Sequence, residues 1–159
     1  MVKKLSDHPN NHPILVPVDF SPYSEAALIQ ACVIADCMQL PIVVLHVIHD
    51  PAEMPGYYGK INKKKNLSKI EDMAKEMFDE FMREVCNRHS QLKSLQQAKT
   101  MMIKGLPVTK ILQVITKLNA SMVVMGSQGR TGLQHILLGS KAEQIVRLAP
   151  VPVTIVKAK

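Results

Sequence analysis

Five short apolar segments alternate along the chain with segments of helical period, and this alternation restricts the fold more than any other feature. The apolar segments are residues 14–18, 41–48, 98–105, 121–125 and 151–157. Helical patterns follow the first four, and several of the apolar segments show no polar alternation. Strands that are apolar on both sides occur in parallel sheets covered by helices. The sequence therefore predicts an α/β fold with an open, mainly parallel sheet and helices on both faces.

The chain of 159 residues is predicted to form a single domain. Residues 1–13 are polar and are expected to be a loose arm, which leaves residues 14–159 as the domain. Residues 49–66, rich in Pro, Gly and Lys, form the longest irregular segment. With 47% apolar residues, ten Met and no Trp, the core is expected to be aliphatic and rich in Met.

The net charge of +7 raises the question of an anionic partner, because Lys60 and Lys63 to Lys65 lie in one short run. A solvated basic surface is the simpler reading, since no nucleic-acid motif accompanies the run and nucleic acid is an unlikely partner. Three cysteines without ligand spacing argue against a disulfide framework or a zinc site. No signal peptide or membrane segment is recognisable, so a cytoplasmic protein is expected.

In an open parallel sheet, ligands bind beyond the carboxyl ends of the strands, where the strand order reverses. Those ends are predicted at Pro17 to Asp19, Val47 to His49 and Met125 to Gly126. Ser21 followed by Pro22 is a helix-start signal directly after the first of these ends. Asp19 could accept a hydrogen bond from a ribose hydroxyl or an adenine amino group, or could simply be a turn aspartate.

Four of the seven glycines fall within residues 123–146, and three of them follow the spacing Gly126-x2-Gly129-x9-Gly139, with Ser140 next. Glycine lets backbone amides approach an anion, and a helix N-terminus adds unpaired N–H groups and positive partial charge. Arg130 and Lys141 could supply countercharge. A glycine turn with an ordinary serine cap would produce a similar pattern. The spacing matches neither a Walker P-loop nor the GxGxxG fingerprint.

Three segments in this order, "ILVPVDFSPYSEAAL", "VVLHVI" and "VVMGSQGRTGLQHILLGSKAEQIVRLAPVPVTIVK", resemble the universal stress protein family, ATP-binding branch. The resemblance implies a five-stranded parallel sheet of order 3-2-1-4-5, four main helices and a homodimer formed through the last strand, Val153 to Lys157. It implies ATP, AMP or ADP as the ligand, with Mg as an optional companion ion. The residues implied for this site are Pro17, Asp19, Val47, Met125, Gly126, Gly129, Arg130, Gly139, Ser140 and Lys141.

Three positions depart from the family's usual pattern. Gln128 stands in place of a common His, Lys141 in place of a small apolar residue, and Ser121 in place of a frequent Asp. Lys141 could strengthen phosphate binding or point to solvent. No catalytic set surrounds the glycines, so the expected function is nucleotide binding in stress response or signalling, with slow ATP hydrolysis or autophosphorylation at most. The alternative is a dimeric interaction module that works without nucleotide.

Overall fold

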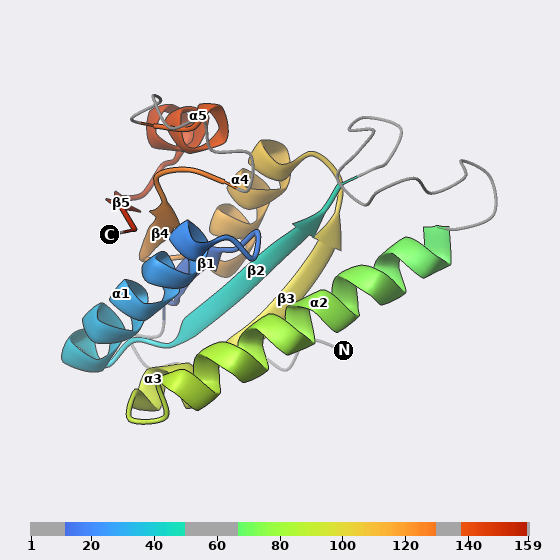
Figure 1. Cartoon of the computed structure of the whole chain (residues 1–159). Coiled ribbons are helices and arrows are strands. Elements are labelled where there is room, and N and C mark those ends of the chain that lie inside the picture. Colours follow the sequence, from blue (N-terminus) through green and yellow to red (C-terminus); the bar gives the residue numbers. More distant parts are fainter. Residues whose placement is uncertain (1–11, 50–66, 130–137, 159) are drawn as a thin grey trace.

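The computed structural model describes residues 12–49, 67–129 and 138–158. They form one parallel sheet, flanked on both sides by helices (Figure 1). In chain order the elements are β1 (Ile14–Pro17), α1 (Pro22–Met38), β2 (Ile42–Ile48), α2 (Leu67–Arg88), α3 (Lys93–Gln96), β3 (Lys99–Lys104), α4 (Pro107–Leu118), β4 (Met122–Gly126), α5 (Ser140–Leu148) and β5 (Val153–Val156).

The strand order is β3-β2-β1-β4-β5, and each pair of neighbours is parallel. This confirms the predicted fold class and order. The structure adds the short helix α3 to the four main helices. The 1–13 arm, apart from its last two residues, lies outside the described residues, as do all but the first residue of the 49–66 segment and the whole Lys60–Lys65 run.

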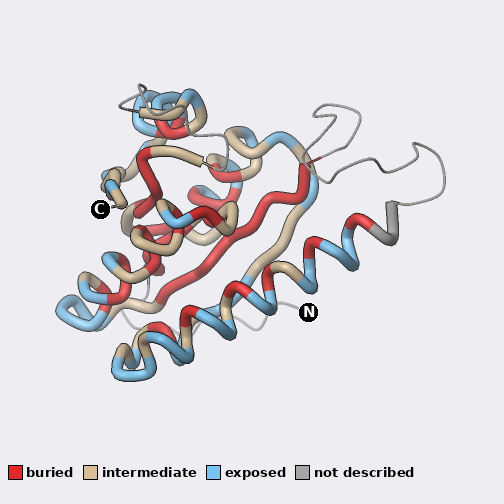
Figure 2. Tube along the Cα trace, in the orientation of Figure 1, coloured by how far each residue is buried: buried red, intermediate tan, exposed pale blue. Residues whose placement is uncertain are grey.

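Successive side chains of the strands enter two different layers of core. Ile14, Val16 and Val44 pack against α1, α2 and α3, whereas Leu15 and Leu45 pack against α4 and α5. All seven residues of β2 are buried, and the strand runs through the molecule as an uninterrupted buried segment (Figure 2). A strand buried on both faces has no polar alternation, which explains the continuous apolar runs in the sequence.

The core is aliphatic, as predicted, but Met contributes less to it than its abundance suggested. Among the described methionines, Met125 is buried, Met82, Met101, Met102 and Met122 pack partly buried against the core, and Met38 and Met73 are 55% and 40% exposed. Branched residues of the strands and the two phenylalanines of α2, Phe78 and Phe81, fill most of the interior instead.

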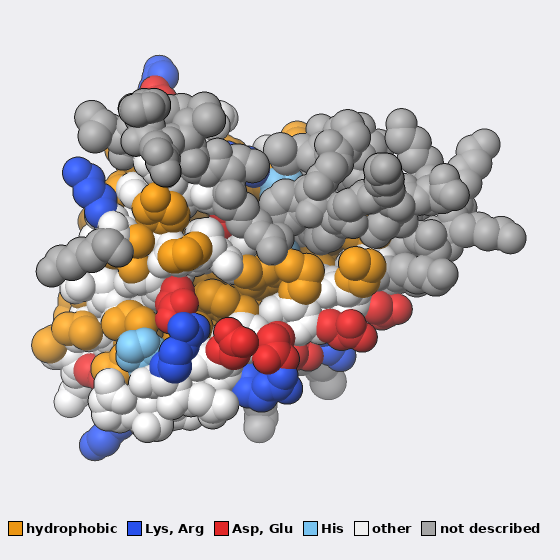
Figure 3. Space-filling model, in the orientation of Figure 1, with side chains coloured by type: hydrophobic (Ala, Val, Ile, Leu, Met, Phe, Trp, Pro, Cys, Tyr) orange, Lys and Arg blue, Asp and Glu red, His pale blue; other side chains and the backbone are white. Residues whose placement is uncertain are grey.

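Helix α2 presents an acidic outer face, although the chain as a whole is basic. Acidic side chains gather along this helix in the space-filling view (Figure 3). The exposed acidic residues of α2 are Glu71, Asp72, Glu76, Asp79, Glu80 and Glu84. Lys75 and Arg83 are interspersed with them, so this face is a solvated helix surface that carries both signs of charge.

Candidate functional site

The candidate site lies at the carboxyl ends of β1 and β4, where the hydrogen-bonded pairing of these two strands ends before β1 does. Their register includes Ile14 with Met122 and Leu15 with Val123, whereas β1 stays paired with β2 as far as Pro17. The amides of Ile14 and Val18 donate toward β2, to Pro41 and Leu45, at 2.9 and 2.8 Å. Since N–H directions alternate along a strand, position 17 faces β4. Proline therefore stands where no donor to β2 is needed.

Asp19 follows this point and is held by the start of α1. Its Oδ1 accepts hydrogen bonds from the backbone N–H and the hydroxyl of Ser21, at 3.2 and 2.6 Å. Ser21 is the N-cap of α1, and its Oγ accepts from the amide of Ser24 at 3.2 Å. Asp19 is thus a turn aspartate, and the same bonds fix the orientation of its carboxylate.

The glycine segment meets Asp19 at Gly129. A Cβ added to Gly129 would lie 2.7 Å from Asp19 Oδ2, closer than real side chains approach. The second carboxylate oxygen therefore lies against the backbone of the loop that follows β4. Two motifs separated by more than 100 residues in the sequence are brought into contact here, as the prediction of a site at the strand ends required.

Gly126 and Gly139 have other structural reasons to be small. A Cβ on Gly126 would lie 2.8 Å from the backbone carbonyl carbon of Tyr23, so glycine at the end of β4 lets α1 pack closely. The Gly139 amide donates to the Ser127 carbonyl at 2.7 Å, and Gly139 is the N-cap residue of α5. This bond brings the start of α5 back to the end of β4.

Ser140 is the first residue of α5 and is exposed, whereas Gly139 is the N-cap, so Ser140 does not cap the helix. Glu143 makes the α-helical bond to the Gly139 carbonyl. The amides of Ser140, Lys141 and Ala142 precede that bond, so they belong to the end of the helix that attracts anions. Arg130 and Gly132 lie outside the described residues.

Lys141 does not simply point to solvent. Its side chain is half-buried, burial lowers the pKa of its ammonium group, and Asp19 partly opposes that change. His49, just beyond the end of β2, is 6% exposed, and its pKa falls from 6.5 to about 4. Burial is the main cause, followed by the charges of Lys141 and His46, with Asp19 opposing. Asp19, His49 and Lys141 therefore share one electrostatic environment.

Pro17 is half-buried beside these groups, whereas the side chains of Val47 and Met125 are buried in the core layer beneath α4 and α5. Val47 and Met125 therefore lie at the predicted strand ends, with their side chains in the core. The sequence places His49 at a predicted strand end but does not mark it as a site residue. The feature that could have identified it is its position, one residue past a fully buried strand.

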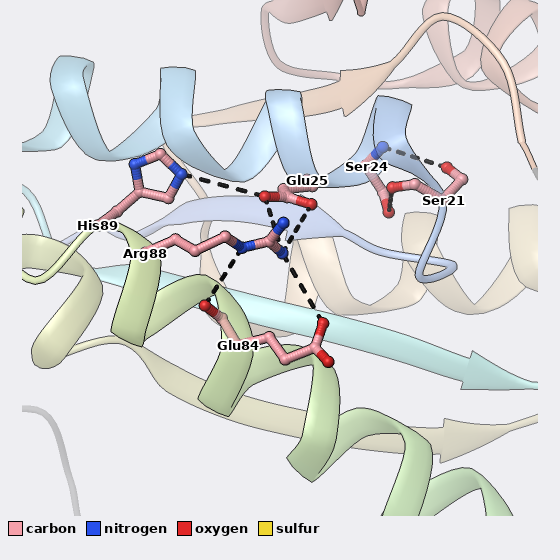
Figure 4. A network of polar contacts seen from close by, with 6 residues as sticks. All are labelled: Ser21, Ser24, Glu25, Glu84, Arg88 and His89. Atoms are coloured by element: carbon pink, nitrogen blue, oxygen red, sulfur yellow. Dashed lines mark hydrogen bonds and ion pairs between the residues drawn. The ribbon is translucent and has the colours of Figure 1, made fainter.

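The first turn of α1, which carries the Asp19 contacts, is also tied to the end of α2 (Figure 4). Arg88 Nη2 lies 3.1 Å from both carboxylate oxygens of Glu25, and Arg88 Nε donates to the Glu84 carbonyl at 3.4 Å. His89 Nε2 lies 4.0 Å from Glu25 Oε1. Arg88 is half-exposed, so these pairs contribute little stability and mainly fix how the two helices meet.

Comparison with known proteins identifies the family. The family model described as "Universal stress protein family" matches residues 10–157, and the chain belongs to this family. Universal stress protein MJ0577 of Methanocaldococcus jannaschii is 27% identical over 153 residues, which are 92% of this chain and 94% of that protein.

Two solved structures share the fold. One is a universal stress protein in complex with cAMP, with a TM-score of 0.67 and 17% identity over 94% of this chain and 98% of the other. The second is the universal stress protein from Archaeoglobus fulgidus in complex with dAMP. It has a TM-score of 0.60 and 22% identity, over 93% of this chain and 99% of the other. No helix among the described residues has the length and hydrophobicity to span a bilayer.

Substitutions at Gly126 and Gly139 should differ in their effect on stability. Gly126→Ala should lower the free energy of unfolding by about 1–3 kcal/mol, because its Cβ forces α1 away from β4. Gly139→Ser is the matched control, because serine caps a helix at least as well as glycine and its Cβ would lie 3.4 Å from the Ser127 carbonyl oxygen, an ordinary contact. Urea denaturation of both variants measures the difference. Equal stability of the two would contradict this account of Gly126.

The lowered pKa of His49 should make the free energy of unfolding of the protein depend on pH. Its pKa is about 4 in the folded protein against 6.5 as the reference value, so the unfolded state binds the proton more tightly. The stabilisation is present above pH 6.5 and is lost as the pH falls towards 4, by at most about 3 kcal/mol. His49→Gln should flatten this dependence in urea denaturation between those pH values. His89→Gln, at a half-exposed site, is the control, and an unchanged slope in His49→Gln would refute the assignment.

Proposed function

We propose that this chain binds an adenine nucleotide, with ATP the leading ligand, at the carboxyl ends of β1 and β4. The observation that carries the proposal is the contact between Asp19 and Gly129 beside the first turn of α5. A carboxylate suited to hydroxyl or amino donors thereby lies next to a glycine loop and a helix N-terminus suited to phosphate. The cAMP and dAMP complexes of proteins with this fold support an adenine nucleotide as the class of ligand.

The proposed contacts divide between the two ends of the nucleotide. Asp19 takes the ribose and adenine end, lined by Pro17, and the backbone of Val47 contacts the base. Met125 and Gly126 flank the ribose. The phosphates are surrounded by the remaining site residues, Gly129, Arg130, Gly139, Ser140 and Lys141. His49 joins them as a neutral, buried neighbour of the Lys141 charge.

The proposed role is to sense or bind nucleotide in stress response or signalling in the cytoplasm, with little or no turnover. Phosphoryl transfer depends on a positioned metal and a group that orients the nucleophile. Asp19 Oδ1 is already engaged by Ser21, which suits a fixed binding group. Magnesium, if bound, would be held through the nucleotide phosphates. Phosphate release measured over hours, with and without Mg, tests for slow hydrolysis or autophosphorylation.

Lys141 supplies the sharpest test of the site. Lys141→Met should weaken ATP binding about tenfold, because it removes a charged partner of the phosphates, and should leave adenosine binding unchanged. Lys99→Met is the matched control, since Lys99 is exposed at the amino end of β3, away from the strand ends that form the site. Calorimetry with ATP, AMP and adenosine measures each affinity.

Gly129→Val combined with Gly139→Val should abolish ATP binding, because both side chains enter the loop that would hold the phosphates. Unchanged affinity in that double variant would refute the site. Failure of the wild-type protein to bind any of these nucleotides at millimolar concentration would refute the proposed function and favour the nucleotide-independent interaction module.

We also propose a homodimer formed by β5 of two copies. All four residues of β5 are partly exposed, and among the described residues β5 is an edge of the sheet that pairs with β4 alone. An apolar edge strand is a template for a second chain. Thr154→Lys brings two like charges to the paired edges and should shift sedimentation from dimer to monomer at micromolar concentration. Thr154→Ser is the control, and a wild-type monomer would refute the dimer.

A further inference from the structure

His46 occupies the fifth position of β2 and is 1% exposed. Its Nδ1 lies 2.8 Å from the backbone oxygen of Val18. A carbonyl oxygen only accepts hydrogen bonds, so Nδ1 carries the proton and donates it. A histidine within a buried strand is usually a core residue whose polar atoms are satisfied internally, and this bond agrees with that role. The partner, however, is the residue that directly precedes Asp19.

Val18 is thereby attached to β2 through both of its backbone polar groups. Its N–H donates to the Leu45 carbonyl at 2.8 Å, and its carbonyl accepts from His46. Val18 lies beyond the last residue of β1, where regular pairing has ended. The His46 imidazole thus adds one hydrogen bond between β2 and Val18 beyond the regular strand pairing, immediately before Asp19.

The residue that follows Asp19 is held by the same imidazole. Phe20 adopts a φ of 65°, a left-handed conformation that is rare for a bulky side chain and persists where packing imposes it. The Phe20 ring stacks on His46, with centroids 4.3 Å apart and planes at 28°. Phe78 and Phe81 of α2 enclose the Phe20 ring, with centroid distances of 5.9 and 5.5 Å.

We infer that His46 is a positioning residue of the nucleotide site, because one imidazole holds both neighbours of Asp19. The hydrogen bond holds the preceding residue and the stacked ring holds the following one, so the Asp19 carboxylate is directed against Gly129. This inference rests on the proposed function and adds a role that acts through Asp19, without contact between His46 and the nucleotide.

Two substitutions separate the hydrogen bond from the ring. His46→Asn keeps an N–H donor near the position of Nδ1 and removes the ring, whereas His46→Phe keeps an aromatic ring and removes the donor. Each should weaken ATP binding about tenfold in the wild-type background, a loss within the range measured for coupled neighbouring residues. In an Asp19→Asn background the same substitutions should change the affinity less than about twofold, because the group that His46 directs is already altered.

Val44→Ala is the matched control for stability. Val44 is fully buried in the same strand and faces the same core layer, away from Asp19. It should lower the midpoint of urea denaturation while leaving ATP affinity unchanged. If the His46 variants lose equal affinity in both backgrounds, or bind ATP as the wild type does, the positioning role is overturned and His46 is a core residue alone.

A readout without nucleotide keeps this inference separate from the proposed function. The Ser21 amide donates to Asp19 Oδ1 at 3.2 Å, so its hydrogen exchange reports the geometry of this turn. Exchange at Ser21 should be about tenfold faster in His46→Phe than in Val44→Ala. Wild-type protein that binds no nucleotide would refute the proposed function, and Ser21 exchange would still decide the positioning role. Equal exchange in the two variants would overturn it.

Discussion

The reversal of strand order between β1 and β4 is the constraint on which the rest of the site depends, because ligands of open parallel sheets bind beyond the strand ends at that point. Hydrogen-bonded pairing of β1 with β4 covers Ile14 and Leu15, the first two residues of β1. Beyond it stand a proline, which lacks the N–H that continued pairing would use, and then Asp19. Helix α1 turns to one face of the sheet and α5 packs on the other, so the chain opens between them.

The three glycines that match one family spacing serve three physical purposes. Gly126 allows α1 to pack on β4, Gly129 leaves room for the Asp19 carboxylate, and Gly139 caps α5 while bonding back to Ser127. A spacing of this kind is therefore a set of separate steric requirements that one binding site imposes together. It follows that a Cβ at Gly126 disturbs packing and a Cβ at Gly129 disturbs the carboxylate, whereas Gly139 has room for a Cβ and requires only a residue that caps the helix.

Few charged groups act at the site, and burial determines how strongly they interact. The net charge of +7 does not describe this environment, and α2 even presents an acidic face. Within the site, Lys141, Asp19 and His49 affect one another, because partial burial reduces screening by water. Lys141 and His49 have lowered pKa values for the same reason, the cost of placing a charge away from solvent.

The sequence by itself determined the elements, their alternation and the two-sided core, because apolar periodicity and helix-start residues such as Ser21 and Pro22 act locally. The strand order and the site residues came from the family resemblance. Tertiary structure alone decided that Asp19 meets Gly129, that Lys141 turns inward, that His49 is buried beside it and that most of the core is branched rather than Met-rich. These properties depend on distances between remote segments and on exclusion of water, and neither quantity is encoded in local spacing.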